Sequence, residues 1–303
     1  MFKKSILLLS FFIILSCTNS KYEYIVKNDD FRKTIKSGYF LEQSKGFTYY
    51  NIENRNSENT LVFIHGFSVP SYIWEKTFNS AKEKGYKVIS LDLFGRGFSE
   101  NPNVNYTDEL FAKQVIDLLE HLEIDKAIFL GLSNGGRVIS KIHDLSPNLI
   151  EKLIYVSASS FGDHEETVQK DVSEKEISDF INEKYPTISS GQLEDFKYPE
   201  NFPNWSNRYE ELLRYKGFAR ALISTLKNHK NLDTENKEIN DSNTKVYTIW
   251  GDSDSVVVYK NIKEKLNKLL PNRFEYFVPN SGHLPHIENQ ENFENYLFET
   301  VLK

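Results

Sequence analysis

Cysteine and clustered positive charge are both scarce in this sequence. The chain of 303 residues has a single cysteine, Cys17, which excludes an intramolecular disulfide and a cysteine-based zinc site. Lysine and arginine number 37 against 43 aspartate and glutamate, a formal net charge of −6, and no basic stripe is present. This balance argues against a nucleic-acid-binding protein, because phosphate contacts need clustered cations.

A long hydrophobic run is also missing. The apolar segment near the N-terminus, Ile6–Leu15, is too short to cross a bilayer as a helix, which takes about 20 residues. It follows Lys3 and Lys4, and a positive segment before a short apolar one is typical of a signal peptide. We therefore expect residues 1–16 to be a signal peptide.

The end of this segment, Ile14-Leu15-Ser16-Cys17, resembles a bacterial lipobox, in which the cysteine is lipidated and becomes the mature N-terminus. The resemblance implies a lipidated Cys17, a polar tether over residues 17–37, and a place in the bacterial cell envelope, anchored to a membrane. The alternative is an ordinary secretory signal with a chance cysteine, and hence a secreted or periplasmic protein.

The rest of the chain has the composition of a folded domain, with 39% hydrophobic and 26% charged residues. From about Phe47, short β-rich runs alternate with helical patterns. This alternation predicts an α/β fold with a doubly wound, mostly parallel sheet. The expected strands are residues 47–52, 60–65, 86–91, 127–132, 152–157, 245–250 and 273–278.

A charged, aromatic and mostly helical stretch interrupts this alternation at residues 161–243. We interpret it as a helical cap inserted between two parts of the core, residues 38–160 and 244–303. The Asn/Lys/Glu-rich end of the stretch, residues 228–243, is expected to be a solvated loop. Large apolar side chains of the cap are expected to form a pocket: Phe161, Trp205, Tyr209, Phe218 and Leu222.

One short motif indicates nucleophilic chemistry. Gly131-Leu132-Ser133-Asn134-Gly135 fits the pattern G-x-S-x-G, directly follows an apolar strand and opens a helix. This is the setting of a nucleophile elbow, in which glycines make a tight turn possible and hold the serine hydroxyl above the sheet. Gly131 and Gly135 would support Ser133 in this way. The alternative is a serine that caps a helix.

A serine is a poor nucleophile without a base. The elbow architecture predicts an acid after a later strand and a histidine after the next one. Asp252 and Asp254 follow the expected strand 245–250, and His283 and His286 follow the strand 273–278. All four side chains are therefore candidates for the same edge of the sheet.

These motifs, in this order, resemble the α/β-hydrolase superfamily from about Phe47 to the C-terminus, most weakly in the cap. The acid of that family follows the pattern G-x-x-D, here Gly251 to Asp254, and its base lies in a G-H motif. The resemblance implies a catalytic triad of Ser133, Asp254 and His283. His286 would pack against or cap the last helix. The remaining histidines are expected in polar surface positions: His121, His143, His164 and His229.

The resemblance also implies an oxyanion hole, which needs two backbone N–H donors. One comes from Asn134, the residue after the nucleophile, and the other from Phe67. Gly66 would let the backbone approach the substrate, and His65 would support this loop rather than act as the base.

The function implied is a serine hydrolase of carboxylic esters, with short or medium acyl chains or monoacylglycerols as substrates, acting through an acyl-enzyme without cofactor or metal. Its partner would be a small-molecule ester. The same triad also suits acyl transfer, C–C bond hydrolysis or perhydrolysis. A non-catalytic envelope binding protein is a further alternative, but such proteins usually lack a triad residue or an oxyanion glycine, and none is missing here.

Overall fold

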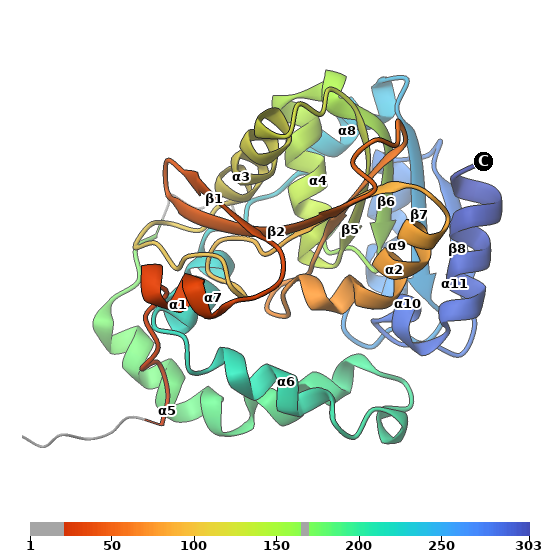
Figure 1. Ribbon diagram of the computed structural model, residues 1–303. Coiled ribbons are helices and arrows are strands. Elements are labelled where there is room, and N and C mark those ends of the chain that lie inside the picture. Colours follow the sequence, from red (N-terminus) through yellow and green to blue (C-terminus); the bar gives the residue numbers. More distant parts are fainter. Residues whose placement is uncertain (1–20, 165–169) are drawn as a thin grey trace, which may run out of the picture.

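One sheet of eight strands organises the chain, and the computed structural model describes residues 21–164 and 170–303 (Figure 1). The strands are β1 (Tyr39–Gln43), β2 (Gly46–Glu53), β3 (Thr60–Ile64), β4 (Lys87–Leu91), β5 (Ala127–Leu132), β6 (Ile150–Val156), β7 (Lys245–Gly251) and β8 (Phe274–Val278). Their order is β1-β2-β4-β3-β5-β6-β7-β8. The pairs β1–β2 and β2–β4 are antiparallel, and every other pair of neighbours in this order is parallel. The expected mostly parallel α/β fold is confirmed.

The strand β1 is the one that the sequence pattern did not indicate. It lies at the edge of the sheet and pairs only with β2 among the described strands. None of its residues, Tyr39–Gln43, is fully buried. An edge strand of this kind lacks the continuous apolar run by which the central strands are recognised.

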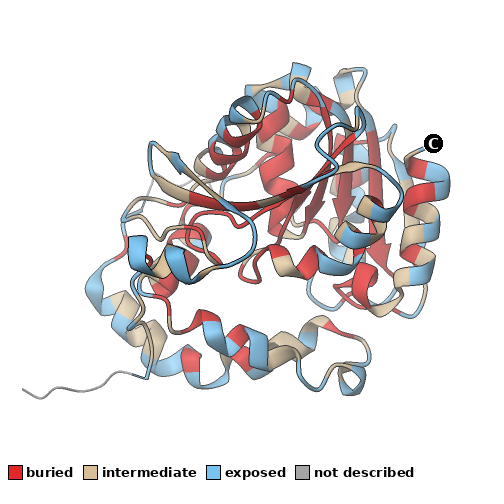
Figure 2. Cartoon of the chain, in the orientation of Figure 1, coloured by how far each residue is buried: buried red, intermediate tan, exposed pale blue. Residues whose placement is uncertain are grey.

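Both faces of the sheet are covered by helices, as the alternation of side chains along β3 shows. Val62 and Ile64 join one buried cluster, while Leu61 and Phe63 join the other. Figure 2 shows the central strands buried throughout. The first face packs against α3 (Asp108–His121), α4 (Asn134–Leu145), α8 (Asp233–Asp241) and α9 (Tyr259–Leu269). The second packs against α2 (Glu75–Glu83), α10 (Pro285–Glu288) and α11 (Gln290–Tyr296).

A helical cap lies between β6 and β7 in sequence. It contains α5 (Glu174–Gly191), α6 (Trp205–Leu212) and α7 (Phe218–Lys227), and α5 packs against both of the others. Figure 1 shows α5 and α6 as a separate layer beyond the edge of the sheet. Ser173 and Glu176 form a capping box that begins α5, so its start is specified locally.

The prediction of a solvated loop at residues 228–243 is wrong, because this stretch contains the helix α8. The helix packs against α4 and α9 as part of the core layer, not the cap. Its Asn236 and Ile239 are fully buried. Asn236 accepts a hydrogen bond from the Ser140 hydroxyl at 2.9 Å and donates one to the Ser160 carbonyl at 3.1 Å. The sequence did not predict this helix because only two of its residues form a buried face and the residues around them are polar.

The described part of the expected tether, residues 21–37, is also docked rather than free, and we call it the N-terminal strap. The Glu23 carboxylate accepts hydrogen bonds from the Tyr185 hydroxyl at 2.6 Å and from the Gly217 and Ala219 N–H groups at 2.8 and 2.7 Å. These two N–H groups open α7, where an anion is favoured. The strap includes the short helix α1 (Asp29–Thr34).

A second contact joins the strap to the core. Lys27 is buried, and its ammonium donates hydrogen bonds of 2.7 Å to the Ser99 carbonyl and to the Asn101 side chain. The strap therefore holds the cap against the core. The expected signal peptide and Cys17 lie outside the described residues. Among the described helices, none has both the length and the apolar character needed to cross a bilayer.

Glu23→Ala tests the strap. The substitution removes the acceptor of three hydrogen bonds, so we expect the free energy of unfolding to fall by about 1–2 kcal/mol. Thermal denaturation followed by circular dichroism would show a Tm lower by a few degrees. Glu58→Ala, at an exposed loop position, is the matched control and should change stability by less than about 0.5 kcal/mol. Equal Tm values for Glu23→Ala and wild type would contradict this role.

Candidate active site

The turn at Ser133 determines where the site lies. Ser133 joins β5 directly to α4 with φ 50° and ψ −116°, a conformation that is costly for a residue with a side chain. Its N–H donates to the Val156 carbonyl at 2.9 Å, and its carbonyl accepts from the N–H groups of Gly136 and Ser159 at 3.0 and 3.1 Å. These three bonds hold the strained turn at the carboxyl ends of β5 and β6.

Two glycines make this turn possible by their lack of a side chain. A Cβ atom on Gly131 would lie 2.5 Å from the Gly135 carbonyl oxygen, and one on Gly135 would lie 2.5 Å from the Ile64 carbonyl oxygen. The start of α4 therefore passes directly over β5 and the end of β3. Substitution of either glycine would require the backbone to move.

Asp254 and His283 reach the same edge from β7 and β8. The Asp254 carboxylate lies 2.9 Å from Nδ1 of His283, and its other oxygen accepts from the N–H groups of Val256 and Val257 at 2.9 Å each. Asp252, the other candidate acid, instead accepts from the Asn280 N–H at 2.9 Å and is partly exposed. The structure thus brings Asp254, and not Asp252, to His283.

The environment of His283 favours its protonated form. Burial by itself would lower the pKa of His283, but the hydrogen bond to Asp254 and the charges of Asp254 and Asp195 outweigh it and raise the pKa above its ordinary value. Because Asp254 holds Nδ1, the second ring nitrogen, Nε2, is left for proton exchange with another group.

Ser133 and His283 line one pocket of about 160 Å³. Its walls come from the loop after β3, from the His283 loop and from the cap residues of the short helix η3 (Gln192–Asp195). A larger cavity, of about 620 Å³, lies near Tyr72 and Arg208, and no member of the expected triad lines it. The chemistry of the smaller pocket, not its size, makes it the candidate site.

The expected apolar pocket of cap side chains is not part of this site. The five residues predicted for it do not line the pocket of Ser133. Four of them are buried in the two clusters beside the sheet: Phe161, Tyr209, Phe218 and Leu222. They stabilise the joint between cap and core, while Trp205 packs against Tyr72 and Phe196.

Two backbone N–H groups beside Ser133 are available to a ligand. Within residues 21–164 and 170–303, no acceptor is found for the N–H of Phe67 or of Asn134. Asn134 is the first residue of α4, where N–H groups lack a partner within the helix. A Cβ atom on Gly66 would lie 3.3 Å from that of Ser133, so the Phe67 loop closely approaches the serine.

His65 holds this loop in place. Its Nε2 accepts from the Leu93 N–H at 2.9 Å, and its Nδ1 donates to the Gly66 carbonyl at 2.8 Å. Complete burial lowers the pKa of His65 to about 3, so the ring is neutral. Arg96 donates to the Phe67 carbonyl at 2.8 Å from the same side. His286 is buried as well and lies 3.0 Å from the Ile73 carbonyl oxygen.

Sequence reasoning missed the surroundings of Asn134. His229 was expected at the surface, but its Nε2 donates to Oδ1 of Asn134 at 2.7 Å. Burial lowers the pKa of His229 to about 3, which keeps this imidazole neutral. The surface position expected for His143 is also wrong, since this residue is 6% exposed. No motif marks His229, because its partner Asn134 lies on another element.

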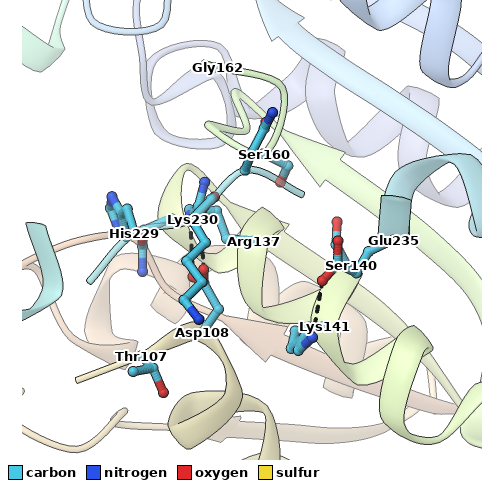
Figure 3. Close-up of polar contacts among 12 residues, drawn as sticks. Thr107, Asp108, Arg137, Ser140, Lys141, Ser160, Gly162, His229, Lys230 and Glu235 are labelled. Atoms are coloured by element: carbon cyan, nitrogen blue, oxygen red, sulfur yellow. Dashed lines mark hydrogen bonds and ion pairs between the residues drawn. The ribbon is translucent and has the colours of Figure 1, made fainter. Parts of the chain in front are cut away.

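Behind Asn134, a buried ion pair ties α4 to α3. Arg137 donates to both carboxylate oxygens of Asp108, at 3.0 and 2.7 Å, and to the Lys230 carbonyl. Figure 3 shows Arg137 and Asp108 directed at one another, with His229 and Lys230 beside them. In the part of the chain that the structure describes, no group of three or more His, Cys, Asp or Glu residues is arranged to hold a metal ion.

Comparisons with known proteins identify the family to which this fold belongs. Residues 59–290 match the family model for the alpha/beta hydrolase fold. A hydrolase of uncharacterized function from Bacillus subtilis, YugF, is 25% identical over 84% of this chain and 93% of its own length. A Haemophilus influenzae protein named as an esterase or lipase is 25% identical over 81% of this chain and 84% of its own.

Solved structures share the fold. The esterase EaEST from Exiguobacterium antarcticum superposes with a TM-score of 0.73 at 19% identity, over 88% of this chain and 100% of that one. The enol-lactonase from Burkholderia xenovorans gives a TM-score of 0.73 at 18% identity, with the same coverage. The family match spans most of the sheet and includes Ser133, Asp254 and His283. The chain therefore belongs to the alpha/beta hydrolase fold family and is a hydrolase.

Proposed function

We propose that this hydrolase is a serine esterase that cleaves small carboxylic esters through an acyl-enzyme intermediate. One observation carries the proposal: Ser133 and His283 line a single pocket, and Nδ1 of His283 lies 2.9 Å from Asp254. A serine, a base and an orienting acid in this relation are the parts of a catalytic triad.

In the proposed reaction, Nε2 of His283 takes the hydroxyl proton of Ser133 as Oγ attacks the ester carbonyl carbon. Asp254 keeps the ring in the correct tautomer and stabilises the imidazolium that forms. The N–H groups of Phe67 and Asn134 stabilise the negative charge on the carbonyl oxygen. His283 then gives its proton to the leaving alcohol, and water attacks the acyl-enzyme with the same histidine as base.

The pocket favours the small end of the expected substrate range. Its volume of about 160 Å³ is below the ~300–1,000 Å³ that is typical of sites for drug-sized ligands. Its lining includes the apolar side chains of Val69, Ile73 and Leu284, which suits a short acyl chain. Acyl transfer, C–C bond hydrolysis and perhydrolysis would use the same residues, and an acceptor other than water would reveal them.

Ser133→Ala tests the nucleophile. The full chain, solubilised in detergent, should hydrolyse p-nitrophenyl acetate and butyrate faster than the palmitate, and the variant should lose this activity to background. A fluorophosphonate probe should label wild type and not Ser133→Ala. A folded wild-type protein that is neither active nor labelled would contradict the proposal and favour a binding protein on this fold.

The pH dependence of kcat/KM tests the base. Because the neutral imidazole is required and the pKa of His283 is raised, activity should fall with decreasing pH, with a midpoint above about 6.5. Asp254→Asn removes the neighbouring charge, so the midpoint should move to lower pH while kcat falls by orders of magnitude. Asp252→Asn is the matched control and should leave the midpoint in place. A midpoint that shifts with Asp252 instead would contradict the assignment.

We also propose that the chain is a lipoprotein of the bacterial cell envelope, with Cys17 as the lipidated residue. The support is the sequence of residues 1–17 alone. Cys17→Ala should abolish incorporation of a labelled fatty acid and release the protein from the membrane fraction of a bacterial host. Fatty-acid labelling that persists in the variant would contradict lipidation of Cys17.

A further inference from the structure

Asp195 of the cap lines the pocket of Ser133 and His283, and its charge is close enough to His283 to raise the pKa of that ring. It is the last residue of η3, and its side chain is partly enclosed by the pocket walls. The proposed mechanism gives it no role. The expected triad already has its acid in Asp254, which is fully engaged with His283 and two backbone N–H groups.

The position of Asp195 is fixed by the backbone around it. The His283 N–H donates to the Asp195 carbonyl at 2.7 Å. The Glu288 carboxylate accepts from the Lys197 N–H at 2.9 Å and also from the Gly282 N–H. These bonds join the cap segment after η3 to the loop that carries the catalytic histidine. The backbone of Asp195 is therefore held beside His283, and a residue that selects substrates needs such a fixed position.

The carboxylate of Asp195 lacks a donor of its own. Among the described residues, none donates a hydrogen bond to its side-chain oxygens or forms an ion pair with them. Burial raises the pKa of Asp195 to about 6; the charge of His283 opposes this rise, and those of Asp254 and Glu194 add to it. The side chain is partly exposed, so a bound substrate that covers it without supplying a donor would leave it buried and unpaired, which is unfavourable.

The rest of the pocket makes this carboxylate decisive for selectivity. Apart from Ser133 and His283, its polar side chains are Ser68, Gln192 and Asp195, and no lysine or arginine lines it. A substrate with a carboxylate of its own would meet a like charge and no cation. A substrate with a hydroxyl or ammonium group would supply the missing donor.

We infer that Asp195 is a specificity determinant, which selects esters with a hydrogen-bond donor close to the scissile bond and rejects esters with an anion there. The inference rests on the proposed esterase function. A hydrogen bond to a charged acceptor changes binding by about ten- to a hundred-fold, which is the range expected for the preference.

Three butyrate esters of matched size test this inference in the full chain: 2-hydroxyethyl, propyl and carboxymethyl butyrate. In wild type, kcat/KM should be about ten-fold higher for the hydroxyethyl than for the propyl ester, and lowest for the carboxymethyl ester. Asp195→Leu should abolish the preference for the hydroxyl. Asp195→Asn keeps the shape of the side chain and removes its charge. This variant should raise kcat/KM for the carboxymethyl ester at least five-fold relative to kcat/KM for the propyl ester.

Ratios between substrates separate this role from a structural one. A variant that merely disturbs His283 would slow all three esters by the same factor and leave the ratios unchanged, which would overturn the inference. Glu194→Gln, at the exposed neighbouring position that does not line the pocket, is the matched control and should leave the ratios as in wild type. If Asp195→Leu does not fold, the nearly isosteric Asp195→Asn carries the test.

The outcome also distinguishes the inference from the function on which it rests. Wild type that cleaves p-nitrophenyl acetate through Ser133, but shows unchanged ratios in both Asp195 variants, would refute the role of Asp195 and leave the esterase proposal standing. Wild type that cleaves no ester at all would contradict both.

Discussion

The strained backbone of Ser133 is the constraint on which the rest of the site depends. A residue with φ 50° and ψ −116° persists only where its surroundings hold it, and here three backbone hydrogen bonds and two glycine contacts do so. Because β5 lies at the centre of the sheet, the turn emerges where the carboxyl ends of neighbouring strands converge. The loops after β3, β7 and β8 therefore reach Ser133 without a long excursion of the chain.

The cap is the part of the fold that tertiary contacts, rather than local sequence, position. At one end Glu23 and Lys27 of the N-terminal strap bind α7 and the core loop. At the other, Glu288 and the His283 N–H bind the segment after η3. Two attachments at opposite ends restrict how far the cap can move from the sheet. The helix η3 is thereby kept at the pocket of Ser133 and His283, whose wall it helps to form.

Prediction from sequence succeeded where one local pattern determined the structure. Buried strands such as β3 and β5 are continuous apolar runs, and the motif around Ser133 is contained within five residues. It failed where the decisive partner is distant in the chain. Nothing near His229 shows that it will meet Asn134, which lies 95 residues away, and α8 looks polar because only one narrow face is buried. The prediction missed the edge strand β1 for a related reason, because half of the surroundings of this strand are solvent.

The two carboxylates near His283 differ in how their oxygens are satisfied, and this difference separates their roles. Asp254 accepts from two backbone N–H groups and lies 2.9 Å from Nδ1 of His283, so both of its oxygens have partners in the protein, as the proposed orienting acid requires. The Asp195 backbone carbonyl accepts from the His283 N–H, whereas its partly exposed side chain has no donor among the described residues. A substrate bound in the pocket of Ser133 and His283 would lie beside Asp195. Polar groups that a protein leaves unsatisfied in a reactive pocket discriminate strongly, because a ligand that lacks the matching group leaves them buried and unpaired.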